Sequence, residues 1–136
     1  MPLPGSVVRT VDIPADSATR ALAAALLARH VPVTAVAPAE GYVESVWYDL
    51  ENRAPRWPET RRLESIVKLR FFADPAAGRT RVVGEVVRRV LVDPSVPERE
   101  LERIVPEGHA GRTLLGEVMT SALGVERPPQ QPGNRN

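Results

Sequence analysis

The residues best suited to acid-base or metal chemistry in this chain are its two histidines, His30 and His109. An imidazole can transfer protons near neutral pH or bind a metal ion through a ring nitrogen. Neither histidine belongs to an HExxH or HxH arrangement, so the spacing of a shared metal site is absent. His30 precedes Val31-Pro32 at the predicted end of a helix, and histidine tolerates the left-handed conformation common there. We therefore expect a structural role for His30.

Other side chains that could act as acids, bases or nucleophiles lack the neighbours that such chemistry needs. The segment Gly108-His109-Ala110-Gly111 is explained equally well by the start of a helix. The chain has no Gly-x-Ser-x-Gly elbow, no Walker loop and no dinucleotide fingerprint. Local hydrogen bonding at turns and strand ends explains the aspartates: Asp12, Asp16, Asp49, Asp74 and Asp93. The sequence therefore predicts no catalytic residue, no metal site, no cofactor and no enzymatic activity.

The composition favours a single globular domain with nearly balanced charge. The chain has 136 residues, 43% of them hydrophobic, and 18 basic against 17 acidic residues give a net charge of +1. Such a balance provides no overall field toward nucleic acid or membrane lipid. No cysteine is present, which excludes disulfides and thiolate ligands within these residues. We expect partner choice to depend on local surfaces.

The sequence predicts no membrane span and no secretory signal. Its longest apolar run, residues 21–28, is too short to cross a bilayer. Residues 1–6 lack the basic and apolar parts of a signal peptide. We expect either a cytoplasmic protein or an exported one whose leader has been removed.

The clearest structural pattern is a β-hairpin over residues 65–92. Pairing Asp74 with Arg79 across a four-residue loop places Lys68 opposite Glu85 on one face. The other face then carries a core-forming set: Val67, Leu69 and Phe71. A slip of one residue would send this whole set to the wrong side, so the pattern specifies which face is buried.

The hairpin face with Lys68 also carries four apolar residues: Ile66, Phe72, Val83 and Val87. Apolar side chains at cross-strand contact distance can form an exposed patch that binds a protein partner. The alternative is that long arginine stems cover them. We take these residues as candidate partner-binding residues.

Gly84 lies within the second strand of this hairpin, on the predicted core face opposite Leu69. Glycine weakens a strand interior unless another element approaches closely there. We expect a helix to cross the sheet at Gly84. The alternative is a ligand crevice bounded by Gly84, Leu69 and Trp47, which would hold a small apolar molecule.

Residues 51–64 form a long predicted loop that holds Trp57 among four arginines: Arg53, Arg56, Arg61 and Arg62. Loops of this length are functional or disordered more often than short ones. Trp57 is therefore a further candidate partner-binding residue.

The remaining segments complete an α+β plan. We expect a strand over residues 6–13, a helix ending near His30, and a second hairpin over residues 33–36 and 42–50. The inner face of that hairpin stays open, because both the set with Val43 and Trp47 and the set with Val46 and Tyr48 could be buried. A short helix near residues 97–105 and a last helix near residues 109–122 follow.

Arg88-Arg89 interrupts the long strand of the first hairpin. An inward Arg88 would be costly to bury without a partner. We expect a β-bulge that turns Arg88 outward, with a buried arginine-carboxylate pair as the alternative.

The predicted order is β-α-β-β-β-β-α, with a mainly antiparallel four- to five-stranded sheet and helices on one face. We expect a flexible lead over residues 1–5, one domain over residues 6–123, and a disordered tail over residues 124–136.

The strand order and the segment Gly41-Tyr42-Val43-Glu44-Ser45-Val46-Trp47-Tyr48 resemble the helix-grip domains of small bacterial envelope lipoproteins, including the outer-membrane assembly type. The resemblance covers residues 6–123 as a pattern. It implies a non-catalytic domain that contacts other envelope proteins. It also implies a periplasmic or outer-membrane-tethered location through a lipidated cysteine, which this chain lacks.

These observations leave three functional hypotheses. The first is a non-catalytic protein-interaction domain, envelope-associated if the resemblance holds, that binds a partner or a second copy of itself. The second is a small apolar-ligand carrier. The third, less favoured, is a nucleic-acid-binding module that would use the sheet's aromatic and arginine side chains.

Overall fold

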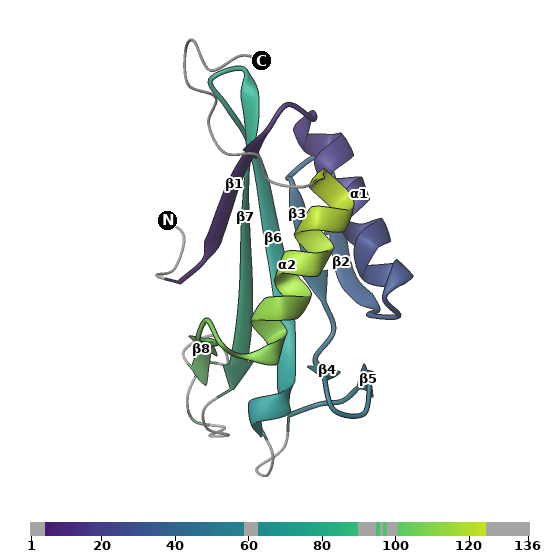
Figure 1. Cartoon of the computed structure of the whole chain (residues 1–136), viewed down its shortest axis with the longest axis vertical. Coiled ribbons are helices and arrows are strands. Elements are labelled where there is room, and N and C mark those ends of the chain that lie inside the picture. The colour runs from purple at the N-terminus through teal and green to yellow at the C-terminus, as the bar shows by residue number, and fades with distance from the viewer. Residues whose placement is uncertain (1–4, 59–62, 90–94, 96, 98–100, 125–136) are drawn as a thin grey trace, which may run out of the picture.

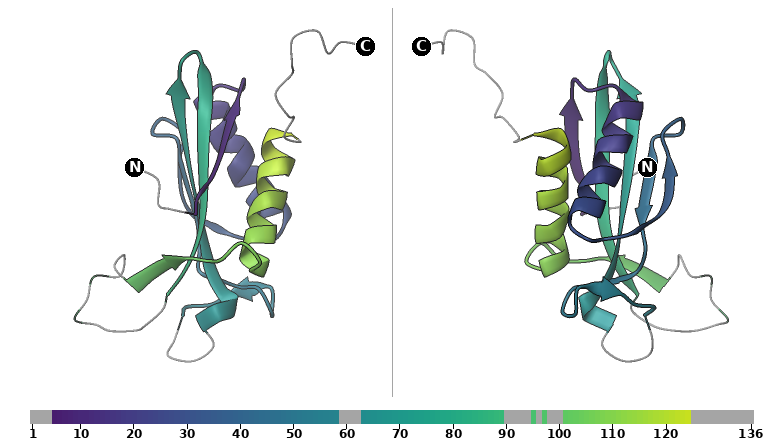
Figure 2. Two further views of the ribbon diagram at one scale, coloured as in Figure 1. Left: turned by 60° about the vertical axis from the view of Figure 1, so that its left-hand side comes forward. Right: turned by 90° about the vertical axis from the view of Figure 1, so that its right-hand side faces the viewer.

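The protein is an α+β fold in which two helices cover one face of a large antiparallel sheet (Figures 1 and 2). This computed structural model describes residues 5–58, 63–89, 95, 97 and 101–124. The α+β class and the placement of both helices on one face are confirmed. The sheet contains eight strands within the described residues, more than the four to five predicted.

The elements follow one another as β1 (Val7–Val11), α1 (Ala15–Ala28), β2 (Val33–Ala37), β3 (Tyr42–Ser45), β4 (Tyr48–Asp49), β5 (Ala54–Pro55), the 3-10 turn η1 (Leu63–Ser65), β6 (Ile66–Ala76), β7 (Arg79–Arg89), β8 (Glu102–Ile104) and α2 (Ala110–Leu123). The long strands lie in the order β1-β7-β6-β3-β2. The short strand β8 pairs with β7 beyond β1, and β4 pairs with both β5 and β6. Residues 1–4, 59–62, 90–94, 96, 98–100 and 125–136 lie outside the described residues, and with them most of the predicted flexible lead and disordered tail, Arg61, Arg62 and Asp93.

The β6–β7 hairpin has a two-residue turn. Ala76 pairs with Arg79, and the turn residues Ala77 and Gly78 have φ angles of 52° and 80°. Two residues with positive φ form the turn whose twist suits a hairpin. The predicted four-residue loop with Asp74 opposite Arg79 is therefore wrong.

The hairpin register differs from the predicted one by two residues, so the faces are those expected but the partners change. Gly84 lies opposite Phe71, and Glu85 lies opposite Arg70 instead of Lys68. An even shift keeps each side chain on its face, because side chains alternate with a period of two.

Strand β7 keeps regular pairing through the two arginines, so the expected β-bulge is wrong. Arg88 pairs with Arg103 and Arg89 with Glu102, in one register with the preceding pair. Arg88 points to the helix side and is only half-buried. It lies two residues beyond Val86, the β7 residue that Gly111 near the start of α2 approaches.

The irregularity lies instead between β3 and β4. The register against β6 changes by one residue between Ser45 and Tyr48. The Ser45 hydroxyl donates to the Val46 carbonyl (2.8 Å) and accepts from the Leu69 N–H (2.9 Å). This one-residue shift reverses which side chains face the helices. Val43 and Tyr48 lie in the core on the helix side, whereas Trp47 lies on the opposite face. Neither of the two predicted inner faces of this hairpin is therefore correct along its whole length.

Helix α1 ends at Ala28, two residues before His30 and close to the end expected from the sequence. His30 has φ 62°, its N–H bonds the Leu27 carbonyl (2.9 Å), and the Val31 N–H bonds the Leu26 carbonyl (3.0 Å). This pair of bonds is the Schellman pattern, which satisfies carbonyls that a helix end leaves free. The structural role predicted for His30 is confirmed.

Helix α2 crosses the sheet at Gly84, which confirms the prediction that a helix packs closely against this glycine. A Cβ placed on Gly84 would lie 3.0 Å from Leu115 Cδ1, 3.1 Å from Met119 Sδ and 3.1 Å from Phe71 Cε1. The helix begins at a cap made by His109, whose Nδ1 accepts from the Gly111 N–H (2.9 Å). The missing side chain at Gly84 therefore makes room for helix packing.

A strand replaces part of the short helix predicted near residues 97–105. Glu102–Ile104 form β8, which pairs with the end of β7. Strand β7 extends past β1, so its backbone groups at this end need a partner, and β8 provides it.

Candidate functional site

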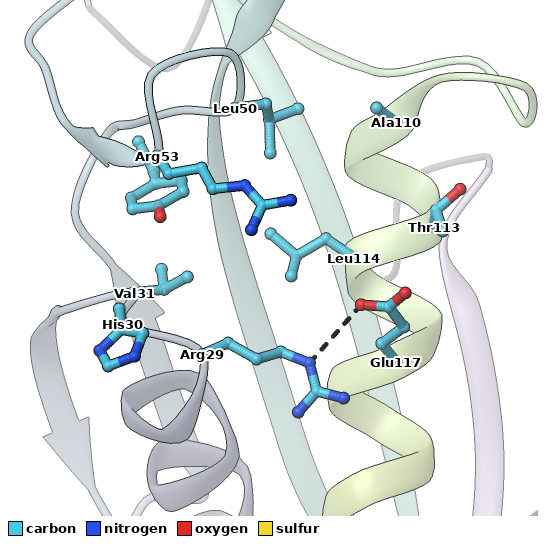
Figure 3. A pocket seen from close by; sticks show the side chains of 10 residues that line it. Arg29, His30, Val31, Leu50, Arg53, Ala110, Thr113, Leu114 and Glu117 are labelled. Carbon is cyan, nitrogen blue, oxygen red and sulfur yellow. Dashed lines mark ion pairs between the residues drawn. The ribbon is translucent and has the colours of Figure 1, made fainter.

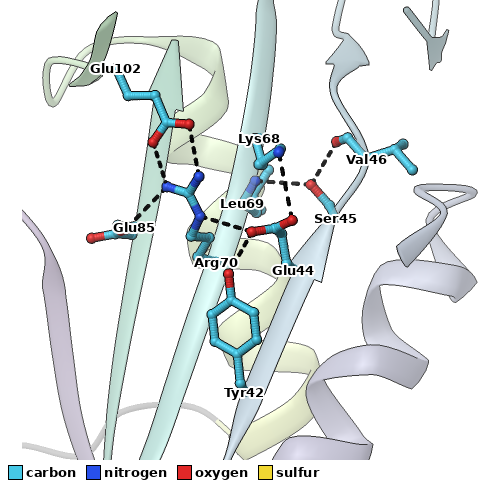
Figure 4. Close-up of polar contacts among 9 residues, drawn as sticks. All are labelled: Tyr42, Glu44, Ser45, Val46, Lys68, Leu69, Arg70, Glu85 and Glu102. Carbon is cyan, nitrogen blue, oxygen red and sulfur yellow. Dashed lines mark hydrogen bonds and ion pairs between the residues drawn. The ribbon is translucent and has the colours of Figure 1, made fainter. Parts of the chain in front are cut away.

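The face of the sheet away from the helices carries a buried polar cluster centred on Arg70 of β6 (Figure 4). The Arg70 Nη1 and Nη2 atoms lie 2.7 and 2.8 Å from the two carboxylate oxygens of Glu102. Its Nε donates to Glu44 Oε1 (3.0 Å), and Glu85 Oε1 lies 3.5 Å from Nη1. The Arg70 side chain is 4% exposed. Four strands, β3, β6, β7 and β8, are therefore joined through one guanidinium group.

Glu44 extends this cluster to the neighbouring side chains of β3 and β6. The Tyr42 hydroxyl donates to Glu44 Oε1 (2.5 Å), and Lys68 Nζ lies 3.5 Å from Glu44 Oε2. Lys68 also lies 4.9 Å from the centre of the Trp47 ring, a cation-π contact. Through Lys68 the polar cluster is thus continuous with Trp47, which packs on the same face of the sheet against Ile66 and Val87.

Burial and pairing shift the pKa values in this cluster. Burial lowers the pKa of Arg70, but the hydrogen bond and charge of Glu102, followed by the bond to Glu44, outweigh burial and raise it. Burial raises the pKa of Glu44, yet hydrogen bonds from Tyr42 and Arg70 and the charge of Lys68 bring it below its usual value. Burial and the Glu44 carboxylate raise the pKa of Tyr42 to about 12. Glu44 and Arg70 are therefore held in their charged forms at neutral pH, and Tyr42 is held as the uncharged phenol that donates to Glu44.

The depressed pKa of Glu44 makes the fold acid-sensitive. A carboxylate whose folded-state pKa lies below its unfolded value stabilises the fold above the unfolded pKa and loses this effect as pH falls through the folded pKa. The ordinary pKa of this group is 4.5. We expect the urea concentration at the unfolding midpoint to decrease as the pH is lowered below that value. Carbon-13 NMR of the Glu44 carboxyl should titrate below pH 4.5. Glu44→Gln should weaken the acid dependence, and titration at or above pH 4.5 would contradict the assignment.

The four residues predicted to form an exposed patch do not do so. Ile66 is 1%, Val83 4% and Val87 0% exposed, so the exposed patch is a wrong prediction for these three. Ile66 and Val87 pack with Trp47 and Ile104 in a small apolar cluster. The prediction placed these side chains on the correct face of the hairpin. Trp47 and Ile104 of β8 cover Ile66 and Val87, and the pattern of a single strand does not show that such a cover exists.

Phe72 is the member of the predicted patch that stays half-buried. Its ring lies 5.2 Å from the Tyr42 ring, measured between centroids, and it pairs with Val83. Val83 also pairs with Val8, which is 42% exposed. The Arg70 cluster lies between these residues and the Ile66 and Val87 end, so the four do not form one continuous patch.

The predicted ligand crevice is not assembled as one space. Gly84 and Leu69 face the helices, and the volume beside Gly84 is filled by Leu115, Met119 and Phe71. Leu69 is fully buried. Trp47 belongs to the apolar cluster on the opposite face. The sheet therefore separates Trp47 from the other two residues.

Trp57 is the predicted binding residue that the structure leaves open to solvent. It follows β5 and is 59% exposed. The Arg89 guanidinium carbon lies 5.5 Å from the centre of the Trp57 ring. Arg89 itself is 7% exposed, and its buried Nε has no hydrogen-bond acceptor among the described residues. The stacked arginine holds the large aromatic surface of Trp57 outward.

A shallow groove of about 380 Å³ lies beside Trp57, on the same side of the sheet as the Arg70 cluster. Trp47 and Lys68 line it from the sheet, and Pro55 and Arg56 line it from the β5 segment. The Arg56 N–H donates to the Trp47 carbonyl (3.0 Å), which fixes the β5 segment against the sheet. The groove, which we call the Trp57 groove, combines aromatic, cationic and proline surface.

The Arg70 cluster is not among the sites predicted from the sequence. Its signal was present as Lys68 and Arg70 on one strand face with Glu44 and Glu85 on the neighbouring strands. The two-residue register error paired Glu85 with Lys68, and the helix predicted near residues 97–105 excluded Glu102 as a partner in the sheet.

In the part of the chain that the structure describes, neither a metal-binding cluster nor a membrane-spanning helix is found. No group of three or more His, Cys, Asp or Glu side chains is placed to hold a metal ion. Neither α1 nor α2 is long and apolar enough to cross a membrane.

Comparison with known proteins gives no family assignment. No protein-family model matches the chain, and no curated protein matches it significantly.

Proposed function

We propose that this protein is a non-catalytic interaction domain that binds a polypeptide partner at the Trp57 groove. The observation that carries the proposal is the 59% exposure of Trp57, stacked on a nearly buried arginine. Tryptophan and arginine are the residues most enriched at energetic centres of protein interfaces. An exposed tryptophan that a cation holds in place loses little side-chain freedom when a partner covers it.

The charges around the groove favour an acidic partner segment. Three cations lie at or next to it: Arg56, Lys68 and Arg89. Arg56 is half exposed and lies 3.6 Å from the buried carboxylate of Asp49. The one carboxylate that lines the groove, Glu44, is already bonded to Arg70 and Tyr42. A partner with an apolar side chain against Trp57 and a carboxylate near Arg56 matches this surface.

The open edge of β2 lies beside the groove and supports an extended partner segment. β2 is the last strand of the sheet order, and its sequence Val-Thr-Ala-Val-Ala has no charged residue. Thr34 of β2 also lines the groove. An unpaired edge without charges can accept an added strand, with neighbouring pockets that select its side chains.

Trp57→Ala tests this function. Acidic-apolar peptides selected from a random display library on the wild-type protein should bind Trp57→Ala at least about 30-fold more weakly, because a central tryptophan contributes about 2 kcal/mol or more. Trp57→Phe should restore part of the affinity. Isothermal titration calorimetry measures each constant, and thermal unfolding checks that the variants fold.

Leu27→Ala is the matched control, because Leu27 is a comparably exposed apolar residue at 55% but lies on α1 on the opposite side of the sheet. It should leave peptide affinity unchanged. Equal peptide binding by wild type and Trp57→Ala would overturn the proposal, as would equal losses in Trp57→Ala and Leu27→Ala.

We also propose that the fold is a variant of the helix-grip type of small envelope lipoproteins. A helix directly after β1 and a last helix that crosses the sheet at Gly84 support this assignment. The envelope location is part of the same proposal.

A further inference from the structure

A pocket of about 440 Å³ lies on the helix side of the sheet, between the end of α1 and the first half of α2 (Figure 3). Its floor is apolar and includes Val31, Tyr48, Leu50 and Leu114. Val31 and Tyr48 are 1% and 4% exposed and belong to the main core. The volume lies within the range of about 300–1,000 Å³ that is usual for small-molecule sites.

Two arginines reach over this pocket. Arg29 Nε lies 3.6 Å from Glu117 Oε1 of α2, and both side chains are partly exposed. Arg53 extends from the opposite wall toward Leu114 (Figure 3). No described residue forms a hydrogen bond or ion pair with Arg53. Two guanidinium groups and one carboxylate leave one net positive charge at the pocket.

The position of Arg53 is built by a buried carboxylate. Asp49, 3% exposed, accepts from the Glu51 N–H (2.9 Å), the Asn52 N–H (3.2 Å) and the Asn52 amide (2.7 Å). The turn that these bonds fix ends at Arg53, which has φ 53°. A bulky residue in the left-handed region costs conformational energy that glycine would avoid. The fold therefore holds a long cationic side chain where the backbone favours glycine.

We propose that this pocket binds a small amphipathic organic monoanion, with its carboxylate on Arg53 and its apolar body against Val31, Leu50 and Leu114. Arg53 provides the charge-assisted hydrogen bonds that a carboxylate needs. The single net positive charge matches one negative charge, and Glu117 disfavours a doubly charged ligand. The amino-terminal end of α2, whose first residue Ala110 lines the pocket, adds attraction for an anion.

Octanoate, 1-octanol and octylammonium serve as probes with one chain and three headgroups. We expect octanoate to bind about tenfold or more tightly than octanol, because charge-assisted hydrogen bonds have roughly that effect, and octylammonium to bind most weakly. Amide and methyl shifts in two-dimensional NMR should centre on Val31, Leu50 and Leu114. Equal binding of the three probes, shifts centred elsewhere, or no saturable octanoate binding would overturn the proposal.

Arg53→Asn removes the charge with a residue that tolerates the left-handed conformation, so the turn should survive. This variant should lose the preference for octanoate and keep its affinity for octanol, whereas Arg53→Lys should keep part of the preference. Arg20→Gln, an exposed arginine on α1 outside the pocket, should behave as wild type. Trp57→Ala should also keep octanoate binding, which separates this site from the Trp57 groove. Retained octanoate preference in Arg53→Asn would contradict the assignment.

Discussion

Replacing Arg70 with methionine is expected to lower the free energy of unfolding by about 3–5 kcal/mol. The variant keeps most of the apolar stem but removes the cation to which Glu44, Glu85 and Glu102 bind. Removing one partner of a buried ion pair leaves uncompensated charge in a site that water cannot fully solvate. Urea unfolding at neutral pH measures the change.

Arg79→Met is the matched control for the Arg70 substitution. Arg79 Nε lies 2.7 Å from Asp12 Oδ1, but the two side chains are 49% and 84% exposed. Exposed pairs contribute at most about 1 kcal/mol because water and salt screen them. Similar losses in the two variants would show that the Arg70 cluster does not contribute through burial. A loss under about 1 kcal/mol in Arg70→Met would contradict the prediction.

Gly41→Ala is expected to lower the free energy of unfolding by about 3 kcal/mol. Gly41 has φ 71°, where an L-residue costs about 1–2 kcal/mol. A Cβ at this position would lie 1.9 Å from the backbone oxygen of Ala73, so the strands must separate there. That movement also weakens the Ala73 N–H to Gly41 carbonyl bond (2.7 Å), with about 1 kcal/mol more lost.

Gly78→Ala separates the conformational cost from the clash. Gly78 also has a positive φ, 80°, but a Cβ there would meet no described atom within 4 Å. This variant should lose only the conformational part, about 1–2 kcal/mol. Thermal or urea unfolding of both variants gives the comparison. Equal losses would mean that contact between the turn before β3 and β6 contributes nothing.

Much of the secondary structure could be predicted from local patterns. The end of α1 just before His30 followed from Val31-Pro32, and the α2 range followed from apolar spacing between His109 and Gly124. Gly84 correctly indicated a crossing helix. These features depend on residues close in sequence, where dihedral limits and periodicity act directly.

The candidate sites were only partly predictable. Trp57 is a candidate partner-binding residue from the sequence, and the structure shows that it is exposed and lines a groove. The hydrophobic set on the outer hairpin face is predicted as an exposed patch, but Trp47 from the β3–β4 bend and Ile104 from β8 pack against two of its members, Ile66 and Val87. Arg53 was seen only as one arginine of a loop, because its pocket needs α1, α2 and the Asp49 turn together.

The sequence by itself determined the two faces of the long hairpin, the carboxyl-terminal ends of both helices to within two residues, and the α+β class, because each depends on alternation or on backbone limits of neighbouring residues. Tertiary structure alone decided the hairpin partners, the shift at Ser45 and the meeting of Arg70 with Glu102. Those outcomes depend on contacts between segments far apart in the chain. Which carboxylate reaches a buried guanidinium is set by strand register and by the open end of β7, not by local preference.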